Sequence, residues 1–350
     1  MNPILGGFGR LIPTPKEAED LSRRSLSFGS NLYLRRAQMQ ASPEDLLAVI
    51  ASTKFRRSAL DPESRLDIEG KVRKAIVEGC PLEFTVPFGA YKNWRLPTGP
   101  GIDWAEVFNL DYLSSFASRI WARHPPGVIV SYTFSSELMA LVSNLRPAWI
   151  HQYRIGFEAL VACANACLPE GMSFHLVDIN SLYPSEEAFR SEYDSNLVSV
   201  EREWVDGLLV EEFMNGKLAS AERNLCPSGQ ADLSPCSPLE WKSLVRQAAI
   251  RCEALDRMSK RRAFNKQSDR IQLVFVRGPS RSLHVGCNIV SARHFWASAG
   301  GAEIRGGKAL PIAIGPEMLA NGSFTACEPE ATESLPICAR PAALYIKHVT

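Results

Sequence analysis

The sequence has no long apolar run and no dominant charge. No segment reaches the roughly 18 to 20 apolar residues that a membrane-spanning helix needs, and the N-terminal residues hold too many Gly and Pro for a signal peptide. Its 39 basic and 38 acidic residues leave a net charge of +1, which disfavours nucleic acid as a partner. We therefore expect a cytoplasmic protein that binds neither membranes nor nucleic acid.

Familiar metal, disulfide and nucleotide patterns are also missing. The nine cysteines are odd in number, contain no CxxC pair and make no zinc-finger spacing with histidine. Cys163 and Cys167 stand four residues apart in an apolar helical stretch, where they could share a metal, although small buried apolar side chains are the commoner explanation. HExxH, Walker, Rossmann dinucleotide and nucleophile-elbow motifs do not occur. The sequence thus predicts reduced thiols, no metal and no cofactor.

What the chain does contain is an alternation of strand and helix signals. With 45% hydrophobic and 22% charged residues the composition is that of a globular protein. Strand-like segments at 82–86, 128–133 and 173–179 alternate with segments of helical spacing. This order predicts an α/β fold with a Rossmann-like, mostly parallel sheet flanked by helices, and a smaller C-terminal α+β part.

We expect three parts along the chain. Residues 1–60 form an N-terminal helical segment, and 61–225 form the Rossmann-like α/β core. Residues 237–350 supply a helix and β segments that complete the core and the site. The helix begins at the capping box of Ser237 and Glu240 and is expected to run to Arg262. The β segments predicted after it are 271–276, 283–290, 309–314 and 344–347.

The most informative segment runs from Cys80 to Phe108, where a short apolar strand enters a Gly- and Pro-rich loop that carries Lys92, Asn93 and Arg95. In open α/β sheets, ligands bind where loops leave the carboxyl ends of strands. Lys and Arg at that place suit a phosphate or a carboxylate. Solvated loop cations are the ordinary alternative. Two aromatic residues and three prolines stiffen this loop, however, which favours a substrate site.

A pair of acidic residues follows at the next helix start. Asp103 and Glu106 are three residues apart and therefore lie on one side of the first turn. They can cap and stabilise the helix, hold a substrate ammonium, or act as a base. Capping is the simplest explanation, and it is compatible with either functional role.

A second candidate anion site lies near the predicted strand at 271–276. Arg277 and Arg281 flank a tight Gly-Pro-Ser turn whose amides could receive a phosphate, although a basic hairpin rim is also common. His284 and His294 follow this turn. Either could serve as a general acid or base near neutral pH, while a structural role is the usual one for a single histidine in a strand.

The order of these features resembles the pyoverdine/dityrosine biosynthesis family, the isocyanide (isonitrile) synthases. The resemblance covers about two thirds of the chain, and Ser135-Ser136-Glu137 stands where the family has Ser-Asp-Gly. The segments that carry it are KVRKAIVEGCPLEFTVPFGAYKNWRLPTGPGIDWAEVF, YLSSFASRIWARHPPGVIVSYTFSSE and ALDRMSKRRAFNKQSDRIQLVFVRGPSRSLHVGCNIV.

The resemblance implies a biosynthetic enzyme of secondary metabolism. Such an enzyme condenses the amino group of an amino acid with a sugar phosphate, ribulose 5-phosphate, without metal or nucleotide. The residues matching its needs are catalytic Lys92, Asp103, His284 and His294, with Asn93, Arg95, Glu106, Arg277 and Arg281 binding substrate. The alternatives are a relative with different amino-acid-modifying chemistry or a non-catalytic binding or partner protein of the same fold. A homodimer is compatible with each of these expectations.

Overall fold

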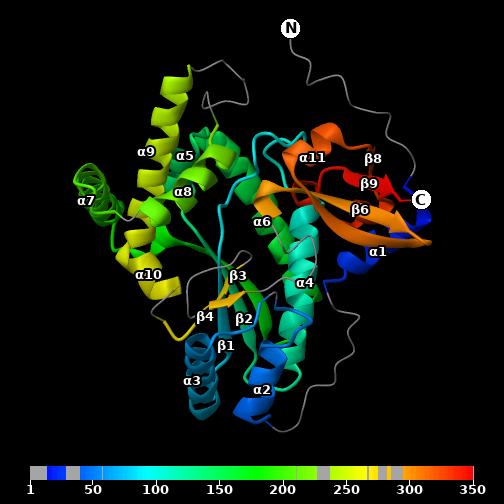
Figure 1. The fold of residues 1–350 in the computed structure, drawn as a ribbon. Helices are drawn as coiled ribbons and strands as arrows, with labels where there is room; N and C mark the ends of the chain where they lie inside the picture. Colours follow the sequence, from blue (N-terminus) through cyan, green and yellow to red (C-terminus); the bar gives the residue numbers. More distant parts are fainter. Residues whose placement is uncertain are drawn as a thin grey trace.

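A parallel sheet runs through the middle of the structure, a computed structural model that describes residues 14–28, 40–56, 58–209, 211–226, 237–265, 268–274, 282–284 and 295–349 (Figure 1). Its strands are ordered β3-β2-β1-β4-β5, and every neighbouring pair is parallel. This is the strand order of Rossmann folds, so the predicted fold class is confirmed. The strands are β1 (Leu82–Pro87), β2 (Val128–Phe134), β3 (Met172–Asp178), β4 (Ile271–Val274) and β5 (Ser282–His284).

The helices before the sheet begin at residues whose side chains cap them. Ser42 accepts a hydrogen bond from the Asp45 amide at the start of α2 (Pro43–Ile50), and Asp61 does the same for α3 (Pro62–Glu78). Gly79 then adopts the left-handed conformation, with φ of 64°, which a residue without a Cβ reaches at little cost. The chain therefore leaves α3 sharply and enters β1. A further helix, α1 (Lys16–Ser25), precedes these.

Two long helices pack on the first strands of the sheet. Helix α4 (Trp104–Trp121) contacts β2 and β3, and α6 (Pro147–Cys167) contacts β3 and α4. Most residues of α4 are buried, because it lies between the parallel sheet and a second sheet. A short helix, α5 (Ser136–Ser143), connects β2 to α6. Ser135 occupies its N-cap position but hydrogen-bonds Asn180 instead of capping the helix.

The charged region after β3 folds as separate helices. They are α7 (Glu186–Val205), α8 (Glu211–Asn224), α9 (Pro238–Arg257) and α10 (Ser259–Asn265). The capping box of Ser237 and Glu240 at the start of α9 is confirmed. The expectation of one helix as far as Arg262 is wrong, because Met258 leaves the helical conformation with ψ of 125°. Helix α10 then turns back to contact α9 and β1.

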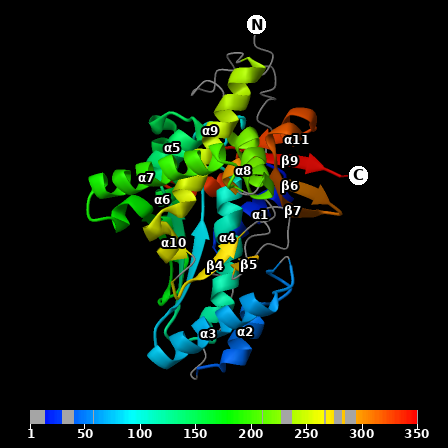
Figure 2. The same cartoon turned by 60° about the vertical axis from the view of Figure 1, so that its left-hand side comes forward.

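The C-terminal residues form a second sheet with the order β7-β6-β9-β8. Figure 1 shows this sheet, in orange and red, beside α1 and α4, and both helices contact its strands. The segments predicted at 309–314 and 344–347 correspond to β7 (Lys308–Ile314) and β9 (Leu344–His348). The sequence did not reveal β6 (Ala299–Arg305), β8 (Thr325–Cys327) or α11 (Pro316–Asn321). Figure 2 gives the same arrangement from a second direction.

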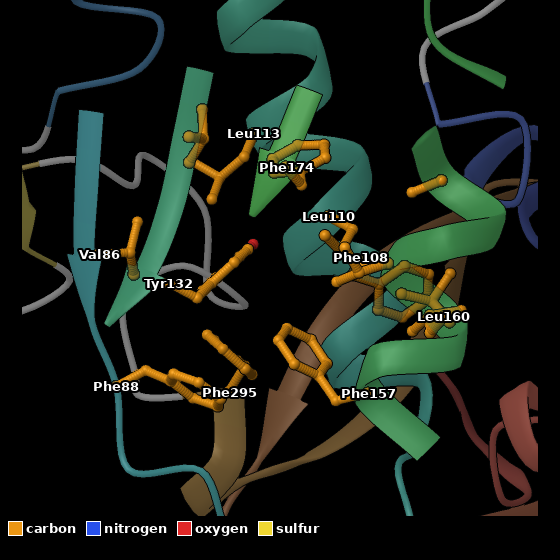
Figure 3. Close-up of a cluster of buried hydrophobic side chains, with 14 of the residues drawn as sticks. Val86, Phe88, Phe108, Leu110, Leu113, Tyr132, Phe157, Leu160, Phe174 and Phe295 are labelled. Atoms are coloured by element: carbon orange, nitrogen blue, oxygen red, sulfur yellow. The ribbon is translucent and has the colours of Figure 1, made fainter. Parts of the chain in front are cut away.

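Aromatic side chains fill the core between β1, β2 and α6. The ring of Phe88, just after β1, stacks on Phe295 at a centroid distance of 5.7 Å and tilts against Phe157 at 5.2 Å. Tyr132 of β2 meets Phe157 edge to face at 5.1 Å, and Figure 3 shows these rings together. Such offset and edge-to-face pairs add to the burial of apolar area. They fix the loop after β1 against α6 and the 3-10 turn η3 (Phe295–Ala297).

Candidate functional site

The loop between β1 and α4 leaves the sheet at its topological switch point. Strand β1 pairs with β2 on one side and with β4 on the other, and the chain runs outward from β1 in both directions. In this strand order the crevice for ligands lies outside the carboxyl ends of the central strands. Lys92, Asn93 and Arg95 thus occupy the place in the fold where the sequence analysis put them.

Lys92, Asp103 and Glu106 form a buried ion cluster at this point. The Lys92 Nζ atom lies 2.9 Å from Asp103 Oδ2 and 2.9 Å from both carboxylate oxygens of Glu106. All three side chains are 0% exposed. An isolated charge at such a depth would be very unfavourable, and a paired one can be accommodated. The predicted lysine and acidic residues therefore do come together, but as one internal group.

Three further groups complete the ion cluster, and none of them was predicted from the sequence. The Tyr153 hydroxyl of α6 donates to Glu106 Oε1 at 2.9 Å, and Lys92 Nζ donates to the Phe295 carbonyl at 3.2 Å. The Trp149 indole donates to the Lys92 carbonyl at 2.8 Å. Trp149 and Tyr153 are four residues apart on α6, so they face the same side. Helical spacing shows that they share a face, but the partner of that face is known only from the fold.

The ion cluster also caps α4. Asp103 accepts a hydrogen bond from the Ala105 amide at 2.7 Å, and Glu106 accepts one from the Asp103 amide at 2.8 Å. This is a capping box, so the predicted capping role is confirmed. Asp103 Oδ1 also accepts from the Gly300 amide of β6 at 3.1 Å. A Cβ at Gly300 would lie 2.2 Å from the Ala105 nitrogen, and a glycine is therefore required where β6 packs against the first turn of α4.

Burial controls the acid–base properties of the ion cluster. Desolvation raises the pKa of Glu106 to about 8, with the charge of Lys92 acting to lower it and that of Asp103 to raise it. The same burial raises the pKa of Tyr153 well above its usual range, and Glu106 adds to the effect. One cation beside two carboxyl groups is electrically balanced when one carboxyl keeps its proton. A protonated Glu106 can donate to the hydroxyl of Tyr153, which accepts as well as donates.

Asn93 and Arg95 point away from the ion cluster, toward α8 and α11. Asn93 Oδ1 accepts from the Arg95 amide at 3.0 Å, and its amide Nδ2 lies 3.4 Å from Asn224 Oδ1. The Arg95 guanidinium pairs with Glu317 at 2.7 Å and donates to the Arg223 carbonyl. Its side chain is 29% exposed. Arg95 thus ties the loop to two helices and retains contact with solvent.

The other predicted residues cannot be placed in the same detail. Arg277, Arg281 and His294 lie outside the described residues, and for His284 the structure describes the backbone of β5. Within the described part, no three His, Cys, Asp or Glu side chains gather in a way that suits a metal ion. The cysteines described there are free thiols. None of the described helices is long and apolar enough to cross a membrane.

Comparison with known proteins gives a structural likeness and no match by sequence. No family model matches the chain, and no curated protein matches it. The crystal structure of PvcA from Pseudomonas aeruginosa superimposes on it with a TM-score of 0.59 at 16% sequence identity. The match covers 87% of this chain and 99% of that one. At this level of identity the likeness establishes that the two chains share a fold.

Proposed function

We propose that this protein is an isonitrile synthase-like biosynthetic enzyme that converts the amino group of an amino acid, with ribulose 5-phosphate as the carbon donor. The observation that carries the proposal is the likeness to PvcA over nearly the whole chain, which supports a remote relationship to isocyanide synthase-like proteins. The motif order in the sequence leads to the same family. In this shared fold the loop after β1 occupies the switch point.

The proposed roles divide between the ion cluster and the outer residues. Glu106, with a pKa of about 8, is suited to gain and lose a proton near neutral pH, and Tyr153 extends its hydrogen bonding. Lys92 and Asp103 hold Glu106 in place. We keep His284 and His294 as proposed proton carriers. Asn93, Arg95, Arg277 and Arg281 remain proposed ligands for the anionic groups of the substrates.

Isotope labelling tests the reaction directly. The purified chain is incubated with each amino acid and with ribulose 5-phosphate carrying ¹³C at every carbon, and the product is analysed by mass spectrometry. We expect an isonitrile that contains one labelled carbon. The isosteric variant Glu106→Gln should lose turnover, whereas Glu201→Gln, at an exposed position of α7, should keep it. An isonitrile formed equally well by Glu106→Gln would remove Glu106 from the reaction.

A non-catalytic binding protein of the same fold is the second candidate. Complete burial of Lys92, Asp103 and Glu106 favours it, because buried ion clusters of this kind also occur as structural elements. In that case the amino acid or the sugar phosphate binds, and neither is consumed. Binding by calorimetry without any loss of substrate in the labelling experiment would support this candidate against the enzyme.

A further inference from the structure

A second polar region lies on the opposite side of α6 from the ion cluster. Trp149 and Tyr153 face the cluster, whereas the neighbouring Ile150, His151 and Arg154 line a groove of about 450 Å³ between α5, α6, α7 and α9. Small-molecule sites in proteins typically have volumes of roughly 300 to 1,000 Å³. We name this space the arginine groove. It adjoins the carboxyl ends of β2 and β3, since α5 follows β2 directly.

The rim of the arginine groove is rich in cations. Arg154, Arg190 and Arg251 line it together with a single carboxylate, that of Glu137. Three guanidinium groups against one carboxylate leave the lining with a net charge of +2 when His151 is neutral. Each guanidinium carries five N–H donors in a planar fork, which suits the paired oxygens of a carboxylate or a phosphate.

Neighbouring groups hold these arginines in place. Arg154 lies 3.2 Å from Glu158 and 3.9 Å from Asp178, both outside the lining. Arg190 pairs with Glu137 and, at 3.0 Å, with Glu186. These carboxylates pair with some of the N–H groups of Arg154 and Arg190, and the other N–H groups of each guanidinium are left for a ligand.

Arg251 is the least compensated cation of the rim. Its Nη1 donates to the Leu141 carbonyl at 3.2 Å, and among the described residues it forms no salt bridge. The Arg251 charge is therefore the one most available to a ligand in the groove.

The floor of the arginine groove is apolar. Ile150 is 1% exposed, Ala140 6% and Leu145 7%, while Leu141 stands at the edge with 45% exposed. A simple inorganic anion would gain nothing from such a floor. A ligand with a hydrocarbon body would gain about 25 cal/mol for each Å² of apolar surface that it buries there.

We propose that the arginine groove binds a small amphipathic anion, with its carboxylate or phosphate at Arg251 and Arg154 and its apolar body on the floor formed by Ala140, Leu145 and Ile150. The proposal goes beyond the proposed function, because it concerns binding alone and applies equally to a non-catalytic protein. For a site of this size, open to solvent, we expect a dissociation constant on the order of 0.1 to 1 mM.

Calorimetric titration of the full chain tests the proposal with four probes. The probes are 3-phenylpropionate, phenyl phosphate, the uncharged 3-phenylpropionamide and inorganic phosphate. We expect saturable 1:1 binding of at least one aromatic anion, and at least tenfold weaker binding of the amide and of inorganic phosphate. The stronger of the two aromatic anions identifies the head group. Equal binding of the amide would overturn the anion site, and so would the absence of saturable binding by both aromatic anions.

Variants then locate the binding. Arg251→Gln removes the least compensated cation, and Leu141→Glu places a negative charge at an already exposed position beside it. Each should weaken binding of the aromatic anion about tenfold or more, whereas Arg202→Gln on the exposed face of α7 should leave it unchanged. Circular dichroism melting of each variant checks that the fold is retained. Wild-type affinity in both folded groove variants would place the site elsewhere and refute the proposal.

Discussion

Replacing Lys92 by Met should destabilise the protein strongly although Met nearly matches its length. The substitution leaves Asp103 and Glu106, both fully buried, without the ammonium group that lies 2.9 Å from each. Removing one partner of a buried ion pair costs roughly 3 to 5 kcal/mol. Since typical domains are stable by about 5 to 15 kcal/mol, this is a large part of the total. Urea unfolding followed by circular dichroism measures the loss.

Two further measurements separate the charge effect from a packing effect. In Lys92→Met the two carboxyl groups are easier to accommodate when protonated, so the loss should be smaller at pH 5 than at pH 8. The double variant Lys92→Met with Glu106→Gln should lose about 2 kcal/mol less than the sum of the single losses. A loss in Lys92→Met no larger than that of Arg95→Ala, a partly exposed cation of the same loop, would refute the reasoning.

Three further perturbations test the ion cluster, a buried carboxyl group and a close backbone contact. Tyr153→Phe removes the hydroxyl that donates to Glu106 and should cost about 1.5 to 3 kcal/mol in urea unfolding at pH 9, where Glu106 is ionised; an unchanged midpoint would contradict this bond. Burial raises the pKa of Asp111 to about 7, and the charge of Arg24 opposes the rise. The protonated Asp111 side chain therefore contributes fully to stability below the ordinary pKa of an aspartate, and this contribution is lost as the pH rises through 7. Asp111→Asn should therefore be more stable than the wild type at pH 8, by on the order of 1 to 3 kcal/mol, and an equal gain at pH 4 would argue against titration. Gly300→Ala should destabilise the protein by several kcal/mol, because the added Cβ would meet α4 backbone atoms at 2.2 and 2.3 Å. Gly216→Ala, in open space on α8, should instead stabilise it by about 0.5 to 1 kcal/mol. Thermal melting compares the two variants.

Elements with local signals could be predicted from the sequence. Helix α3 begins at an Asp-Pro pair and ends at a glycine, and both signals act within a few residues. The parallel order of β1 to β3 follows from the alternation of strands and helices. By contrast, β6 starts Ala-Gly-Gly-Ala and has no strand pattern. It forms because Gly301 and its neighbours pair with β7 and β9. The strand propensities of the local residues do not predict such pairing.

The candidate site was predictable in position but not in form. The sequence placed Lys92 in a loop after a strand and Asp103 at a helix start, and both placements are correct. The hydrogen bonds that shape the site are long-range, however. Lys92 and Phe295 are 203 residues apart in the sequence, and Tyr153 and Glu106 are 47 residues apart. No local pattern encodes such pairs. The division of the chain into 1–60, 61–225 and 237–350 stays a prediction.

The strand order has a consequence for how the chain reaches its native state. The central strand β1 has β2 on one side from residue 128 onward, but its other neighbour, β4, begins at residue 271. During synthesis β1 is therefore an unprotected edge strand until nearly two hundred further residues have emerged. Such late, long-range pairing slows folding and leaves an edge open to association with other chains. A fragment ending near residue 225 should accordingly aggregate when expressed alone, and adding the chain through β4 and β5 should restore solubility.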